Sequence, residues 1–60
     1  QLRLAKARQL LSMGEQPVDV AASLGFADQS HLGRWFQRAY RISPAHYRRL
    51  CTNLPDVSNK

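Results

Sequence analysis

Apolar residues recur along this chain at the spacing of an α-helix. Near the start, four of them follow one another at intervals of three, three and one positions: Leu4, Ala7, Leu10 and Leu11. This spacing places them on one face of an amphipathic helix, which we expect from about Leu2 to Met13. Gly14 follows, and glycine readily adopts the left-handed conformation in which many helices end.

Two more helices with a tight turn between them are predicted next. Proline is favoured in the first turn of a helix, so a short helix is expected from about Pro17 to Leu24, where Gly25 ends it. Asp28 can accept hydrogen bonds from the free amides of the following helix, expected from about Gln29 to Tyr40. That helix carries a wide apolar stripe, formed by Leu32, Trp35, Phe36, Ala39 and Tyr40.

A short fourth helix is expected from about Pro44 to Leu50 or Cys51. It begins with the N-cap Ser43, which a first-turn proline follows. Residues 52–60 are expected to form a flexible polar tail that contains Pro55. No stretch shows the period of two that strands require, so the predicted fold class is all-α.

The inward positions of these helices should form one small core. We expect this core to contain Leu10, Leu11, Val20, Ala21, Leu24, Phe26, Leu32, Phe36 and Tyr47. Trp35 is open to two interpretations, as a core residue or as an aromatic surface on which bases stack.

Length and composition restrict the class of protein. Sixty residues allow one small domain, which leaves little room for the cleft of an enzyme. Cys51 is the single cysteine, so no internal disulfide can form, and no closely spaced Cys or His pairs suggest a zinc site. Cys51 and His46 are the one conceivable nucleophile pair, and they lack a third, orienting group. We therefore expect no enzyme, no metal and no cofactor.

Hydropathy predicts no membrane-spanning helix, and a membrane is not the expected partner. The longest apolar run covers three residues, 20–22, whereas a helix needs roughly 18 to span a bilayer. We expect a soluble, cytoplasmic protein.

Positive charge is confined to the second half of the chain. Up to and including Asp28, basic and acidic side chains are equal in number, so the net charge of +5 lies entirely beyond it. Positions 29–55 contain five arginines and no carboxylate. This imbalance indicates a polyanionic partner, and nucleic acid fits best. An anionic membrane surface, an acidic protein or ordinary solvation of the arginines are the alternatives.

Two short helices joined by a glycine-containing turn, the second with a basic outer face, are typical of a helix-turn-helix. Several positions resemble the C-terminal helix-turn-helix of AraC/XylS-type bacterial transcription regulators: Ala21, Leu24-Gly25-Phe26, Asp28, Ser30, Leu32, Arg34, Phe36, Ser43-Pro44 and Tyr47-Arg48. Further matches resemble the helix that links the two DNA-binding subdomains of that family: Arg3-Leu4, Ala7 and Leu10-Leu11.

The resemblance implies that residues 1–51 form a linker helix and a second, homeodomain-like helix-turn-helix unit. It implies sequence-specific binding of double-stranded DNA as part of a bacterial transcription regulator, with a recognition helix at about 29–40 in the major groove. An N-terminal helix-turn-helix and an effector domain would belong to the parent chain. The alternative function is a protein-interaction module that contacts RNA polymerase or another acidic partner.

Some positions depart from the family pattern. Arg41 stands where glycine is usual, so either it adopts a left-handed conformation or the turn differs. Pro17 replaces an apolar residue, and Gln37 replaces a basic one. Trp35-Phe36-Gln37 also resembles the third helix of a homeodomain, but Arg38 stands where that family has the asparagine that reads adenine.

Docking of the third helix in the major groove would assign roles to its exposed residues. Recognition helices present their N-terminal residues to base edges, and the candidates for base reading are Gln29, Ser30, His31 and Arg34. Gly33 lies near this face, either to permit close approach or as a plain helix glycine. Phosphates would be bound by basic side chains and by free amides at a helix start. The predicted phosphate contacts are Arg38, Arg41, Ala45, His46 and Arg48.

Overall fold

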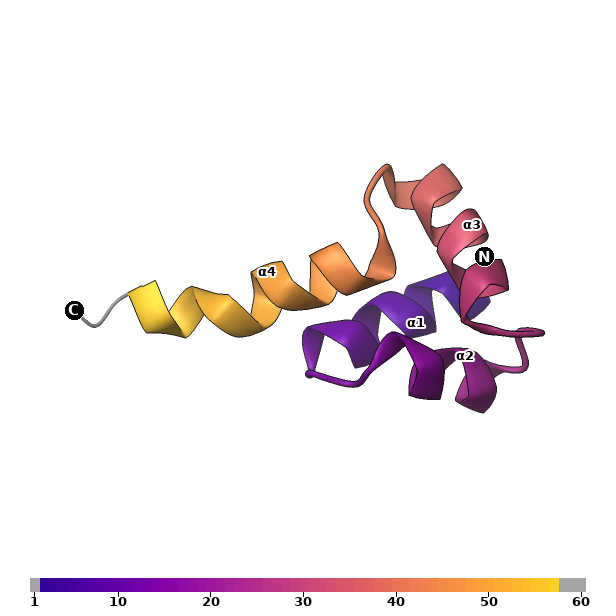
Figure 1. Ribbon diagram of the computed structural model, residues 1–60, viewed down its shortest axis with the longest axis horizontal. Helices are drawn as coiled ribbons and strands as arrows, with labels where there is room; N and C mark the ends of the chain where they lie inside the picture. Colours follow the sequence, from indigo (N-terminus) through magenta and orange to yellow (C-terminus); the bar gives the residue numbers. More distant parts are fainter. Residues whose placement is uncertain (1, 58–60) are drawn as a thin grey trace.

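The computed structural model describes residues 2–57, and over this range the chain forms four helices (Figure 1). Their bounds are α1 Leu2–Ser12, α2 Pro17–Leu24, α3 Gln29–Tyr40 and α4 Pro44–Val57. No strand occurs among the described residues. The predicted all-α fold class and the three first helices are therefore confirmed, with α1 one residue shorter than expected.

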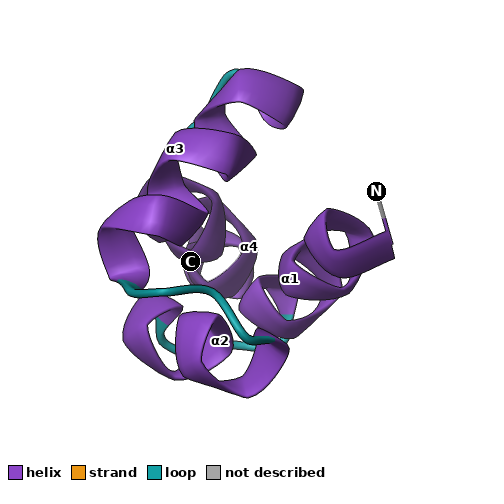
Figure 2. Ribbon diagram, turned by 90° about the vertical axis from the view of Figure 1, so that its right-hand side faces the viewer, coloured by secondary structure: helices purple, strands orange, loops and turns teal. Residues whose placement is uncertain are grey.

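The helices pack around α1, which contacts each of the other three. In the view of Figure 2, α2 lies beneath both α1 and α3, and a short loop joins α2 to α3. Figure 1 shows that α4 begins beside α1 and that its second half runs away from the other helices. Helices α2 and α3 form the helix-turn-helix, and α1 packs against both of them.

The helix ends follow from single residues. Gly14 and Gly25 have φ angles of 98° and 82°, the left-handed region that glycine reaches without strain. At the start of α3, Oδ1 of Asp28 accepts the N–H of His31 at 2.8 Å, which caps the helix as predicted.

Arg41 ends α3 in the left-handed conformation, with a φ of 63°. Its N–H donates to the carbonyl of Gln37 at 2.7 Å. The first of the two possibilities for this position is thus the observed one. Left-handed backbone costs a residue with a side chain about 1 to 2 kcal/mol, and Arg41 bears that cost.

The core is built from the inward faces of α1, α2 and α3 and the turn between the last two. The buried apolar side chains are Leu4, Ala7, Leu11, Val20, Ala21, Phe26, Leu32 and Phe36. Leu4 and Ala7 were not among the expected core residues. Three expected members, Leu10, Leu24 and Tyr47, are only half-buried and pack against the edge of this core.

The apolar stripe of α3 is narrower in the structure than its sequence suggests. Leu32 and Phe36 are buried, whereas Trp35 is 40% exposed and Ala39 is exposed. Tyr40 is half-buried, with its ring centre 4.8 Å from that of Phe36. Only one side of α3 therefore holds it to the domain, and the remaining surface is free for a partner.

Helix α4 is longer than predicted. It was expected to end at Leu50 or Cys51, and the structure continues it to Val57. The expected tail is therefore wrong for residues 52–57, and residues 58–60 lie outside the described part. Pro55 lies within this helix, although proline lacks an N–H and disfavours helix in the preceding residue. A helix can continue past proline with one backbone hydrogen bond fewer, and α4 does so.

Candidate nucleic-acid interface

The outward face of α3 is polar and basic. Because Leu32 and Phe36 point inward, the residues on the far side of the helix are exposed, and they include Ser30, Arg34 and Gln37. Ser30 and Arg34 lie four residues apart and therefore share this face. The face contains two of the residues predicted to read bases, and Gln37 extends it by a further turn.

A groove runs between the start of α3 and the start of α4. Its volume is about 240 Å³, and its lining consists of Pro17, Gln29, Ser30, Gly33, Ser43, Pro44 and Ala45. The groove brings the predicted base readers Gln29 and Ser30 next to the predicted phosphate contact at Ala45. Sequence spacing alone could not locate this groove, since it depends on where the turn after Arg41 directs α4.

Gly33 lines this groove, and the fold gives no reason for a glycine there. It lies inside α3 with a helical backbone, and an added Cβ would meet nothing within 4 Å. Glycine in a helix interior costs about 1 kcal/mol relative to alanine. Neither packing nor backbone conformation requires a glycine at this position. The lack of a side chain at Gly33 therefore affects only the space in the groove.

The start of α4 has fewer amides available to an anion than expected. The N–H of His46 donates to Oγ of Ser43 at 3.1 Å, which caps the helix as predicted from Ser43. The N–H of Tyr47 donates to the carbonyl of Ser43 at 2.9 Å. Two backbone amides were predicted to bind phosphate, those of Ala45 and His46. The amide of His46 is engaged by the cap, so the amide of Ala45 is the one that remains at the groove.

His31 lies on the opposite flank of α3 from the groove. Its Nδ1 accepts the N–H of Ala27 at 3.2 Å, and its ring is half-buried. The ring meets Phe26 edge-on, with centres 5.6 Å apart, and the centre of Trp35 is 6.4 Å away. The structure therefore separates His31 from Gln29 and Ser30, with which it was grouped.

The predicted phosphate-binding arginines have different surroundings. The guanidinium of Arg38 lies 5.8 Å from the ring centre of Trp35, a cation–π contact at the surface. Arg41 is exposed at the end of α3. Arg48 is half-buried, and its Nε donates to the carbonyl of Gly14 at 2.9 Å. Arg48 thus joins α4 to the turn between α1 and α2, a role in the fold that sequence reasoning missed.

The described residues contain no cluster of three or more side chains suited to hold a metal ion. Over the same range, each helix is too short or too polar to cross a membrane.

Comparisons with known proteins agree with this geometry. The model of a family described as "Helix-turn-helix domain" matches residues 1–50. The curated HTH-type transcriptional regulator MtrA of Neisseria gonorrhoeae is 41% identical over 49 residues. The match covers 80% of this chain and 16% of MtrA, so the chain spans a small part of the length of this relative. No solved structure gives a significant match.

Proposed function

This chain belongs to the AraC-type helix-turn-helix domains of DNA-binding transcription regulators, a non-enzymatic family, and on that basis we propose that α3 reads double-stranded DNA from the major groove. The observation that carries the proposal is the groove between α3 and α4. There the exposed first turns of α3 lie beside a helix start, so base edges and a phosphate could be contacted together.

Base reading is assigned to the residues on the outward face and in the groove. Gln29 can pair with N6 and N7 of adenine, and Arg34 can pair with O6 and N7 of guanine. Ser30 stands between them and can donate to or accept from either kind of base. Each bidentate pair would contribute roughly 1 to 3 kcal/mol of discrimination. His31 is left out of this set because its ring packs against Phe26 on the other flank.

Phosphate binding is assigned to Arg38, Arg41 and the amide of Ala45. Arg48 and the amide of His46 are left out because they are used within the fold. With two or three phosphates neutralised, log affinity should fall against log salt with a slope of about −2 to −3. Binding by this chain alone should be weak, with a Kd on the order of 10⁻⁴ to 10⁻⁶ M at physiological salt. A second helix-turn-helix in the parent protein would add contacts about one helical turn away.

The test is a binding-site selection from a random duplex pool, followed by fluorescence anisotropy on the selected duplex and its point variants. Arg34→Ala should reduce the preference for one base over the others at one base pair, whereas Arg38→Ala should lower the affinity for all duplexes equally. Lys6→Ala is the matched control, because it removes one positive charge from the exposed face of α1. Unchanged affinity and unchanged preference in Arg34→Ala would contradict this docking.

The role in the parent protein follows from this assignment. We propose that the parent protein regulates transcription in the cytoplasm and that its remaining part supplies a second helix-turn-helix and an effector domain. RNA polymerase is the partner expected if DNA-bound protein acts as an activator.

A further inference from the structure

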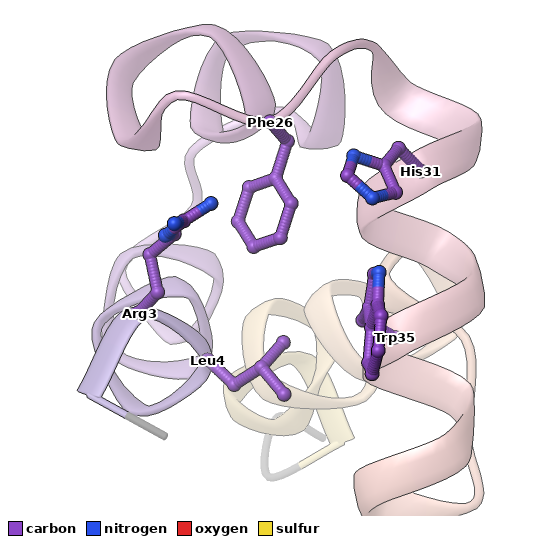
Figure 3. A pocket seen from close by; sticks show the side chains of 5 residues that line it. All are labelled: Arg3, Leu4, Phe26, His31 and Trp35. Atoms are coloured by element: carbon purple, nitrogen blue, oxygen red, sulfur yellow. The ribbon is translucent and has the colours of Figure 1, made fainter.

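A second hollow lies on the flank of α3 that faces α1. It has a volume of about 200 Å³ and is lined by Arg3, Leu4, Phe26, His31 and Trp35 (Figure 3). His31 and Trp35 are one helical turn apart on this flank, while Gln29 and Gly33 are one turn apart on the other. The exposed face of α3 lies between the two flanks. We name this hollow the Trp35 pocket.

The Trp35 pocket has an apolar floor and an aromatic wall. Leu4 and Phe26 are only 4% and 9% exposed and form the floor, whereas Trp35 is 40% exposed. Tryptophan is enriched where proteins bind one another, because it offers a large rigid surface with a polar edge. An apolar group placed between Trp35 and Phe26 would be removed from water on two sides.

The polar groups of the Trp35 pocket are hydrogen-bond donors. The guanidinium of Arg3 lies 5.1 Å from the ring centre of Phe26. Because Nδ1 of His31 accepts the N–H of Ala27, the proton of the neutral ring is on Nε2. The indole nitrogen of Trp35 also only donates. Figure 3 shows nitrogen atoms of all three side chains around Phe26 and Leu4.

The charge around the pocket is positive. None of the five lining residues has a carboxylate or an amide side chain, and Arg3 supplies a positive charge beside Phe26. The nearby carboxylate of Asp28 accepts the N–H of His31 as the cap of α3. A ligand that complements the pocket therefore carries an anion beside an apolar group.

The size of the pocket favours a protein segment over a free small molecule. Sites for small molecules usually enclose about 300 to 1,000 Å³, more than the 200 Å³ of this open hollow. We propose that the Trp35 pocket docks an acidic segment of a partner protein. One apolar side chain of that segment packs between Trp35 and Phe26, and an adjacent carboxylate binds Arg3. Since the residues proposed to read bases lie elsewhere on α3, we expect the chain to bind both partners at once.

The test uses Trp35 as its own reporter, because it is the single tryptophan of the chain. The probe is the peptide acetyl-GDEFDEG-amide, titrated into the protein while tryptophan fluorescence is recorded. Two control peptides separate charge from apolar contact: acetyl-GKKFKKG-amide carries the opposite charge, and acetyl-GDESDEG-amide lacks the aromatic anchor. We expect a saturable change with the first peptide and none with the controls.

Variants then locate the contact. Arg3→Ala should lower the affinity for the acidic peptide about fivefold, because one charge pair at the surface is lost. Arg3→Glu should abolish this binding and confer binding of the basic peptide, a reversal that a structural defect would not produce. Lys6→Ala should change nothing. Equal binding of the acidic peptide by the wild type and Arg3→Glu would overturn the proposal.

DNA supplies the last arm of the experiment. With a saturating DNA duplex present, affinity for the acidic peptide should stay within twofold of its value without DNA. Displacement of the peptide by the duplex would overturn the proposal by assigning the pocket to the DNA surface. The titration without DNA is informative even if the chain binds no duplex, so failure of this proposal and failure of the DNA-binding proposal are distinguishable.

Discussion

The substitution Gly33→Ala should raise stability and lower DNA affinity at the same time. In α3 the added methyl group meets nothing within 4 Å, so the helix gains the full preference of alanine over glycine, about 0.8 to 1.0 kcal/mol. For a domain of this size, 1 kcal/mol shifts the midpoint of thermal unfolding by about 4 to 8 °C. Circular dichroism at 222 nm during heating measures the shift.

DNA binding should respond in the opposite direction. The methyl group would occupy the groove between α3 and α4 that Gly33 lines. If a base edge approaches the backbone here, the crowding should cost about 1 to 3 kcal/mol, which is roughly a 5- to 150-fold loss of affinity. Fluorescence anisotropy with the selected duplex measures this loss. Residues on the far flank, such as Trp35, are unaffected by the change.

Gly25→Ala is the matched control. An added Cβ at Gly25 would also meet nothing within 4 Å, but its φ is +82°. The same methyl group should therefore destabilise the protein by about 1 to 2 kcal/mol, because the left-handed backbone strains alanine. A lower unfolding midpoint for Gly33→Ala would refute the reasoning about α3. A higher midpoint with unchanged DNA affinity would refute the close approach of DNA.

Three further predictions concern stability. Arg41→Gly should raise the unfolding midpoint by relieving the left-handed strain of about 1 to 2 kcal/mol at a φ of 63°. It should also weaken DNA binding, and a lower midpoint would contradict the strain. Arg48→Ala should lower the free energy of unfolding in urea by about 1 kcal/mol, since the hydrogen bond from Nε to the carbonyl of Gly14 is lost. The folded fraction of this variant should retain its DNA affinity. Weaker DNA binding by the folded variant would indicate that Arg48 contacts DNA. Burial, and secondly a hydrogen bond to Cys51, raise the pKa of Tyr47 above its ordinary 10.0, so its contribution to stability is complete below pH 10 and is lost as pH rises through the folded value. Unfolding midpoints recorded from pH 8 to 11 should show a decline that Tyr47→Phe reduces; an equal decline in both proteins would contradict it.

The sequence predicts helices well where a local residue decides the outcome. Pro17, Asp28 and the glycines at 14 and 25 mark helix ends through their own backbone preferences, and those ends are observed. The continuation of α4 past Cys51 was missed, because the polar residues after it were expected to form a tail; the proline among them disfavours a helix but does not forbid it.

The candidate site was harder to predict, because it depends on contacts between distant elements. Arg48 looks like a free cation in the sequence, and only the fold places its Nε beside Gly14, 34 positions earlier. His31 follows the exposed residues Gln29 and Ser30 in the sequence, yet the turn before the helix positions Ala27 to hold its ring inward. Helical periodicity identifies a face, but it does not show which side chains of that face turn back onto the protein.

The attachment of α3 has a consequence for how such a protein can change. Only two of its twelve residues, Leu32 and Phe36, are buried. Surface substitutions away from caps and special backbone conformations usually alter stability by less than about 0.5 kcal/mol. Most of α3 can therefore vary with little effect on folding, and if α3 reads DNA as proposed, a regulator of this kind can acquire a new DNA preference through a few substitutions while the rest of the domain stays unchanged.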